Sequence, residues 1–113
     1  MDLERLQYRG FKPRQEVTDQ AQKVSQKILD ESPIEGSARV VIADQGEHFH
    51  VSVVGKTSDR KLFSSESVFR KQNIRGWPRE WQLGALVEVL GDFVRQLRGH
   101  FKSKLGDDEA PKQ

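Results

Sequence analysis

The sequence predicts an α+β fold, in which the element order β-α-β-β-β-α forms a four-stranded sheet with two helices packed on one face. Two stretches, one in each half of the chain, repeat apolar residues at helical spacing. Between them lie three short stretches that alternate in polarity or are rich in β-branched residues, separated by tight turns. Strands joined in this way form an antiparallel meander, which the two helices are expected to cover.

A short strand and a helix are predicted for the first third of the chain. Residues 3–9 alternate loosely, and Pro13 cannot continue a strand because it has no backbone N–H. Thr18 is the predicted N-cap of the helix. Ser32-Pro33 is predicted to end it, because the residue before a proline disfavours the helical conformation. The apolar face of this helix consists of Val17, Ala21, Val24 and Ile28.

The meander is predicted to comprise residues 38–43, 47–56 and 60–68. Turn-forming residues separate the three strands, and the middle strand alternates most clearly. Its inward-facing residues are Phe49, Val51 and Val53, and its outward-facing residues are His48, His50 and Ser52.

A long C-terminal helix is predicted to begin at Pro78, after an irregular and basic connection over residues 69–77. Gly106 is predicted to end this helix. Its glycines are expected to allow close packing across the sheet: Gly84, Gly91 and Gly99. Its apolar stripe comprises Leu83, Leu86, Val87, Leu90, Val94, Leu97 and Phe101.

Composition and charge limit the classes of function. The 113 residues are predicted to form one domain, residues 1–106, followed by a disordered tail over residues 107–113. The absence of cysteine excludes disulfides and thiolate chemistry. No apolar run has transmembrane length and no signal peptide is recognisable, so we expect a cytoplasmic protein with no membrane partner. The net charge of +2 is small, so any binding to nucleic acid must depend on local clusters of cations.

One such cluster is predicted near the end of the C-terminal helix. Arg95, Arg98 and Lys102 lie at i, i+3 and i+7, which places them on one helical face, away from the apolar stripe. A row of fixed cations on a packed helix is a common way to hold a phosphate backbone. Cations at a helix C-terminus are also favoured by the negative end of the helix dipole, so the pattern by itself leaves both interpretations open.

Two tryptophans lie among arginines where the C-terminal helix is predicted to begin. Trp77 and Trp81, with Arg75 and Arg79 beside them, could stack on unpaired bases or contact a partner. The alternative is that a tryptophan closes the end of the core. We favour that alternative for Trp81, and both interpretations stay open for Trp77.

Patterns typical of catalysis are missing from the sequence. There is no glycine-rich phosphate loop, nucleophile elbow or zinc-binding His-Glu pair. His48 and His50 share a strand face and could chelate a metal, but no third ligand has suitable spacing. We therefore expect a solvated strand face there, with no metal, no cofactor and no enzymatic activity. The acids of the last helix, Glu88 and Asp92, are expected to pair with Arg95.

Several short motifs accompany the predicted element order. They are Tyr8-Arg-Gly10, Val17-Thr-Asp-Gln-Ala21 at the first helix, Gln96-Leu-Arg-Gly-His100, and Lys102-Ser-Lys-Leu105. In these motifs and in its element order the chain resembles the ribosome hibernation promoting factors, also called ribosome-associated inhibitor proteins, over residues 6–105. Double-stranded-RNA-binding domains have a related arrangement of helices and sheet.

The resemblance implies a non-enzymatic factor that binds rRNA in the decoding region of the small ribosomal subunit and inhibits translation or protects idle ribosomes. It also implies that both helices face rRNA phosphates, with contacts that are mainly to the backbone and sensitive to salt. We expect the free protein to be a monomer. The RNA-binding residues carried over by the resemblance are Lys23, Lys27, Arg95, Arg98, Lys102 and Lys104.

The chain departs from this family at residues 69–81, where the family has a short link between the last strand and the last helix. Gly99 also stands where the family often has a basic residue. A second interpretation is therefore kept: a protein-interaction or regulatory module with the same fold that does not bind the ribosome. In that case Trp77 and Trp81 would form the centre of the interface.

Overall fold

The computed structural model of the chain describes residues 1–77 and 80–109, with side chains as far as Ser103. The described part contains four strands, two helices of at least four turns and one short helix. In chain order the elements are β1 (Asp2–Arg9), α1 (Gln15–Leu29), β2 (Gly36–Asp44), β3 (His48–Thr57), β4 (Leu62–Arg70), α2 (Lys71–Ile74) and α3 (Trp81–Glu109).

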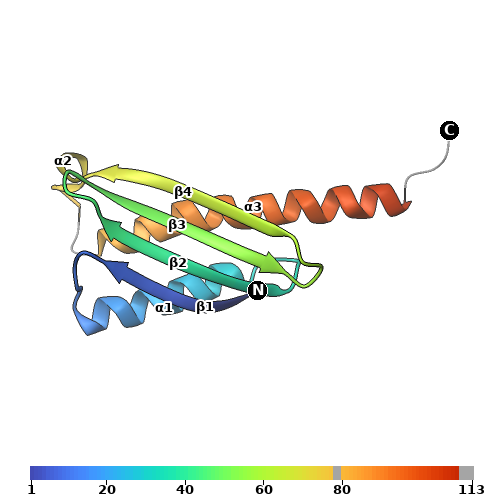
Figure 1. Ribbon diagram of the computed structural model, residues 1–113, viewed down its shortest axis with the longest axis horizontal. Coiled ribbons are helices and arrows are strands. Elements are labelled where there is room, and N and C mark those ends of the chain that lie inside the picture. Colours follow the sequence, from blue (N-terminus) through green and yellow to red (C-terminus); the bar gives the residue numbers. More distant parts are fainter. Residues whose placement is uncertain (78–79, 110–113) are drawn as a thin grey trace.

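The four strands form one mixed sheet in the order β1-β2-β3-β4 (Figure 1). β1 pairs with β2 in parallel, because α1 carries the chain back between them. β2, β3 and β4 form the antiparallel meander expected from the two tight turns. Opposite residues such as Val40 and Val53 belong to the same face, so the register keeps the apolar side chains of neighbouring strands together.

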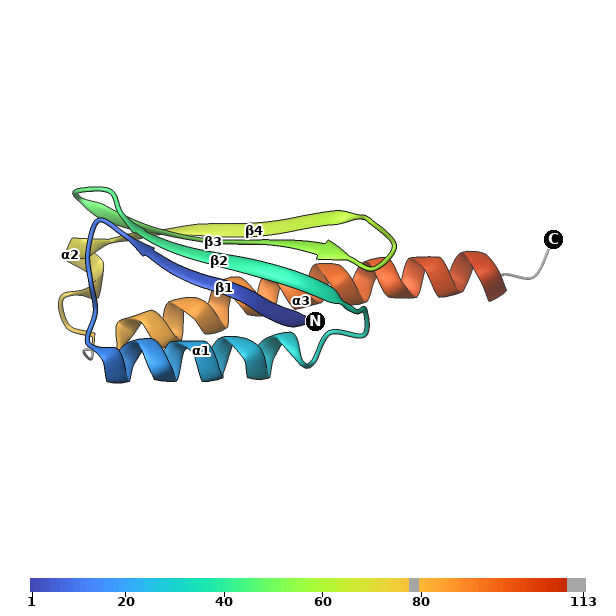
Figure 2. The same cartoon turned by 60° about the horizontal axis from the view of Figure 1, so that its bottom comes forward.

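α1 and α3 lie side by side on one face of the sheet and run in the same direction (Figure 2). This arrangement confirms the predicted α+β fold with two helices on one face. α3 is much longer than α1, and its C-terminal part extends beyond the end of the sheet. None of the helices in the described part of the chain is long and apolar enough to cross a membrane.

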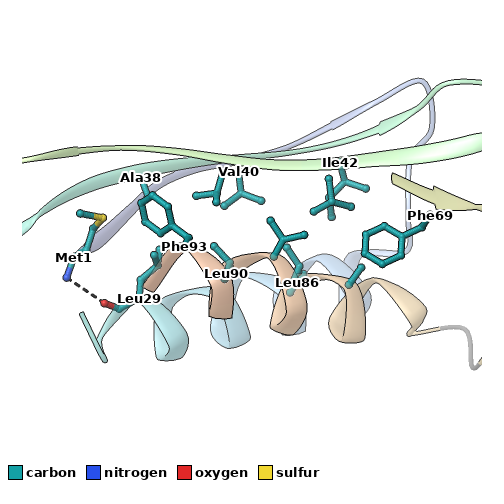
Figure 3. Packing of buried hydrophobic residues seen from close by; sticks show 14 of the residues in the cluster. Met1, Leu29, Ala38, Val40, Ile42, Phe69, Leu86, Leu90 and Phe93 are labelled. Atoms are coloured by element: carbon teal, nitrogen blue, oxygen red, sulfur yellow. Dashed lines mark hydrogen bonds between the residues drawn. The ribbon is translucent and has the colours of Figure 1, made fainter. Parts of the chain in front are cut away.

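The core lies between the sheet and the helical layer (Figure 3). Alternate residues of β2 and β3 point toward the helices, as the period of two predicts, and α3 presents a stripe at helical spacing. Each large apolar side chain buried here contributes about 1.5–3 kcal/mol to stability. Fully buried residues include Val40, Ile42, Val51, Leu86, Leu90, Phe93 and Leu97.

The limits of the helices differ from the prediction at two places. α1 begins at Gln15, and Thr18 lies inside it with its hydroxyl donating to the carbonyl of Arg14, so Thr18 is not the N-cap. α3 continues through Gly106 to Glu109, so the prediction that Gly106 ends it is wrong. A glycine costs a helix only about 1 kcal/mol, which neighbouring turns can offset. The predicted tail thus begins inside the helix, and its residues 110–113 lie outside the described part.

Three further predictions for the C-terminal helix and the segment before it are wrong. The basic connection is partly regular, because β4 extends to Arg70 and α2 follows at once. Val87 is exposed, because Val89 and Phe93, which the predicted stripe omitted, are buried in the core in its place. The glycines do not mediate close packing: a side chain at Gly84 or Gly99 would meet no atom within 4 Å. Pro78, the predicted first residue of the helix, lies outside the described residues.

Candidate nucleic-acid interface

The exposed side of the helical layer carries the cations predicted to bind RNA. We call this the helical surface and define it by the exposed residues Lys23 and Lys27 of α1 and Arg95, Arg98 and Lys102 of α3. The apolar stripes of both helices face the sheet, so these side chains are directed to solvent. The side chain of Lys104 lies outside the described residues.

The two helices bring part of this set together. Nη2 of Arg98 lies 3.8 Å from Oε2 of Glu31, one turn beyond Lys27 in the sequence, so Arg98 lies beside the C-terminal end of α1. Lys23 lies one turn before Lys27 on α1, where it lines a shallow cavity of about 530 Å³ formed by β1 and α1. The cations therefore form a broad band across the helical layer instead of one compact cluster.

Acidic neighbours reduce the positive charge of this band. Arg95 forms an ion pair with Asp92 on the same helix, as the helical spacing predicted, and Arg98 pairs with Glu31. All four side chains are at least half exposed, so each pair contributes little to stability and can open at small cost. Lys23, Lys27 and Lys102 form no ion pair with another described residue. The lysines are thus the cations most available to a ligand.

The two tryptophans have different environments. The Trp81 ring lies 4.4 Å from that of Phe49, centroid to centroid, within a series of aromatic contacts that continues through Phe11 to Tyr8. Burial raises the pKa of the Tyr8 phenol, whose hydroxyl donates to Oε1 of Gln82 at 3.3 Å. Trp81 therefore closes the end of the core, as favoured from the sequence. This aromatic group joins β1, β3 and the start of α3.

Trp77 remains accessible. It is 41% exposed, and the edge of its ring contacts Phe69 at a centroid distance of 6.2 Å. With exposed Val68 and with Ile74 it lines a cavity beside β4 that Glu88 of α3 borders. Glu88 is not among the partners of Arg95. Arg75 is exposed on a different cavity, and Arg79 lies outside the described residues.

The outward histidines each contact a neighbouring polar side chain. Nε2 of His50 lies 2.8 Å from Oε2 of Glu66, and Nε2 of His48 lies 2.8 Å from Oε1 of Gln45. Among the described residues, no group of three or more His, Asp or Glu side chains could hold a metal ion. Their placement is that of an outward-facing strand surface.

Sequence reasoning missed a second convergence of cations. Arg70, Lys71 and Arg75 line a cavity at the junction of β4 and α2. Glu47 of the β2–β3 turn and His48, the first residue of β3, line it as well. The basic residues in the segment 70–75 could have indicated this cavity. However, this segment reaches the β2–β3 turn only through the pairing of β3 with β4, which the local sequence does not show.

Comparison with known proteins adds one finding. The N-terminal domain of Protein Y from Thermus thermophilus superposes on this chain with a TM-score of 0.63, and the match covers 88% of this chain and 99% of that domain. The two share one fold. Their sequences are 14% identical, so the likeness concerns the fold alone. No protein-family model matches the chain, and no curated protein matches it by sequence.

Proposed function

We propose that the protein is a ribosome-associated, non-enzymatic factor that binds rRNA of the small subunit through its helical surface and so inhibits translation or protects idle ribosomes. The observation that carries the proposal is the pair of parallel helices on one side of the sheet (Figure 2), each of which carries exposed cations. Cations fixed on a rigid layer suit the regularly spaced phosphates of folded RNA.

The sequence motifs and the fold both support this proposal. The short motifs of the sequence resemble those of hibernation factors, and the fold agrees with the one that this resemblance implies. The shared fold with the N-terminal domain of Protein Y supports a ribosomal role in the same way. The ion pairs of Arg95 and Arg98 weigh against strong binding, but exposed pairs exchange easily for phosphate contacts.

Co-sedimentation of the protein with purified small subunits and with whole ribosomes, across a salt series, tests the proposal. We expect saturable binding that weakens steeply as salt rises. The double substitution Arg98→Glu and Lys102→Glu should abolish binding and leave the circular dichroism spectrum unchanged. Arg9→Glu with Lys12→Glu makes the same charge change at the opposite end of the molecule and should retain binding. Absence of binding even at low salt would refute the proposal.

A protein-interaction role is the second candidate, favoured by the exposed Trp77 in the cavity beside β4. An exposed tryptophan next to apolar groups is a frequent centre of protein interfaces. If this role holds, Trp77→Ala abolishes capture of the partner in a pull-down, whereas charge reversal on the helical surface has little effect. The opposite pattern would favour the rRNA proposal.

A further inference from the structure

The junction of β4 and α2 is fixed to the turn between β2 and β3 by Lys71. Its backbone N–H donates to the carbonyl of Glu47 at 3.0 Å, and its Nζ lies 2.8 Å from Oδ1 of Asp44. The same ammonium group lies over the ring of Phe49, 4.8 Å from the centroid. These three contacts hold α2 against the β2–β3 turn at one end of the sheet, on the left in Figure 1. The backbone that carries the side chains around this junction is therefore held in a fixed position.

A cavity of about 490 Å³ opens at this junction. Its volume is that of small-ligand sites in general, but its lining is polar and charged instead of apolar. Three cations face one carboxylate, and an imidazole and an amide complete the lining. The lining residues are Glu47, His48, Arg70, Lys71, Gln72 and Arg75.

Positive side chains outnumber negative ones around this cavity. Lys71 is neutralised by Asp44, outside the lining. Arg70 and Arg75 are exposed and form no ion pair with a described residue, although Glu47 lies in the same cavity. Two unmatched guanidinium groups against one carboxylate leave a surplus of positive charge. A guanidinium presents paired N–H donors that match two oxygens of one phosphate, which a lysine ammonium does not.

From this geometry we infer a second anion site, separate from the helical surface, in which Arg70 and Arg75 bind a phosphate group and the Gln72 amide supplies a further donor. Lys71 positions the site through its contacts with Asp44 and Glu47, and does not itself need to bind the ligand. The phosphate can belong to a free nucleotide or to an RNA backbone, which present the same group.

The site is independent of the proposed rRNA surface. It lies at the end of the sheet where α3 begins, and the rise of a helix from Trp81 to Arg98 alone is about 25 Å. One RNA phosphate therefore cannot contact both. Failure of binding at either place leaves the other proposal intact, so the two can be tested separately.

Backbone amide chemical shifts in an NMR titration test the inference. The ¹⁵N-labelled protein is titrated in parallel with sodium pyrophosphate, ADP and a short single-stranded oligouridylate, with sodium chloride at equal ionic strength as the reference. We expect saturable shifts at residues 47–48 and 70–75 for pyrophosphate and for whichever of the other two carries the native phosphate. The affinity for this site is taken from these residues alone, because an oligouridylate also shifts residues of the helical surface if that surface binds RNA. Tighter binding of ADP would identify a nucleotide as the source, and tighter binding of the oligouridylate an RNA.

Variants decide whether the arginines carry the site. Arg70→Gln with Arg75→Gln should weaken pyrophosphate binding at least about tenfold, because two charge-assisted contacts are lost. The matched control, Lys56→Gln with Lys61→Gln, removes the same charge at the other end of the sheet and should leave the affinity unchanged. If the double variant does not fold, Arg75→Gln alone, in an exposed position after α2, should still weaken binding severalfold.

Three results would overturn the inference. The first is shifts that do not saturate or that sodium chloride reproduces, since these indicate general charge screening. The second is equal weakening by the Lys56 and Lys61 control. The third is unchanged pyrophosphate affinity in a folded Arg75→Gln variant, which would show that the guanidinium does not contact the anion.

Discussion

Phe93 of α3 packs directly against the backbone of β3 at Gly55. A β-carbon at Gly55 would overlap the tip of the Phe93 ring and would approach Sδ of Met1 to 3.2 Å. Phe93 is completely buried and is the largest such side chain in the core. The absence of a side chain at Gly55 thus sets how closely α3, and with it the helical surface, approaches the sheet.

Replacement of Gly55 by alanine should destabilise the fold. The added methyl group has no space, so the Phe93 ring or the helix must shift, and such overpacking costs about 1–3 kcal/mol. The measurement is the free energy of unfolding from urea denaturation. Gly84→Ala is the control, because this helical position is open and alanine there should add about 0.5–1 kcal/mol of stability. Equal effects of the two substitutions would contradict the packing account.

The two tryptophans should differ in their contribution to stability. Trp81→Ala removes an aromatic group that contacts Phe49 at the end of the core, and should lower the free energy of unfolding by about 2–4 kcal/mol. Trp77→Ala removes a side chain with 41% exposure and should cost about 1 kcal/mol or less. Thermal and urea denaturation of both variants measure the difference. A larger loss at Trp77 would mean that its ring, not Trp81, closes the core.

Salt dependence should report how many lysines contact rRNA. Lys27 and Lys102 are exposed and form no ion pair with another described residue, so each is free to replace a counterion on a phosphate. Loss of each contact by substitution with glutamine should flatten the slope of log affinity against log salt by about 0.7–0.9. Binding of small subunits over a range of potassium chloride measures the slope. An unchanged slope in both variants would place the rRNA contacts elsewhere.

Acid should weaken the contact between the β2–β3 turn and α2. The hydrogen bond from Lys71, with a further one from the backbone N–H of Gly46, lowers the pKa of the Asp44 carboxyl below its ordinary value. Because the lowered pKa belongs to the folded state, this carboxylate stabilises the fold above its ordinary pKa. That contribution is lost as the pH falls through the lowered pKa.

The Asp44→Asn variant lacks this titration. Its melting temperature should therefore fall less than that of the unaltered protein as the pH is lowered from neutral into the range of carboxyl protonation. Differential scanning calorimetry over that pH range measures the effect. Parallel pH profiles for the two proteins would show that the contact with Lys71 does not couple to folding.

The strand and helix periods could be recognised in the sequence because each relates residues only a few positions apart. Val51 and Val53 alternate with polar residues, and they are buried on the inner face of the sheet as predicted. Leu86, Leu90 and Leu97 recur at helical spacing and lie in the core. The same helical spacing wrongly predicted that Val87 is buried. Spacing alone does not show which of two adjacent rows of apolar residues on a helix faces the sheet.

The candidate site could be predicted only in part, because local spacing does not reveal contacts with other elements. The spacing of Arg95, Arg98 and Lys102 placed them together on one helical face, but that spacing says nothing of acids on other elements. Glu31 meets Arg98 only because α1 and α3 pack in parallel. Arg70 and Arg75 likewise line one cavity with Glu47 only because β3 and β4 pair in one register.

By itself, the sequence determined the four strands, the two long helices and the α+β class, since alternation and helical spacing act between residues a few positions apart. Tertiary structure alone decided how close the layers lie, which cations are paired and where a charged cavity forms. These depend on contacts between distant segments, of which the approach of Phe93 to Gly55 is the clearest case. Neither residue has a local pattern that indicates the other as its partner.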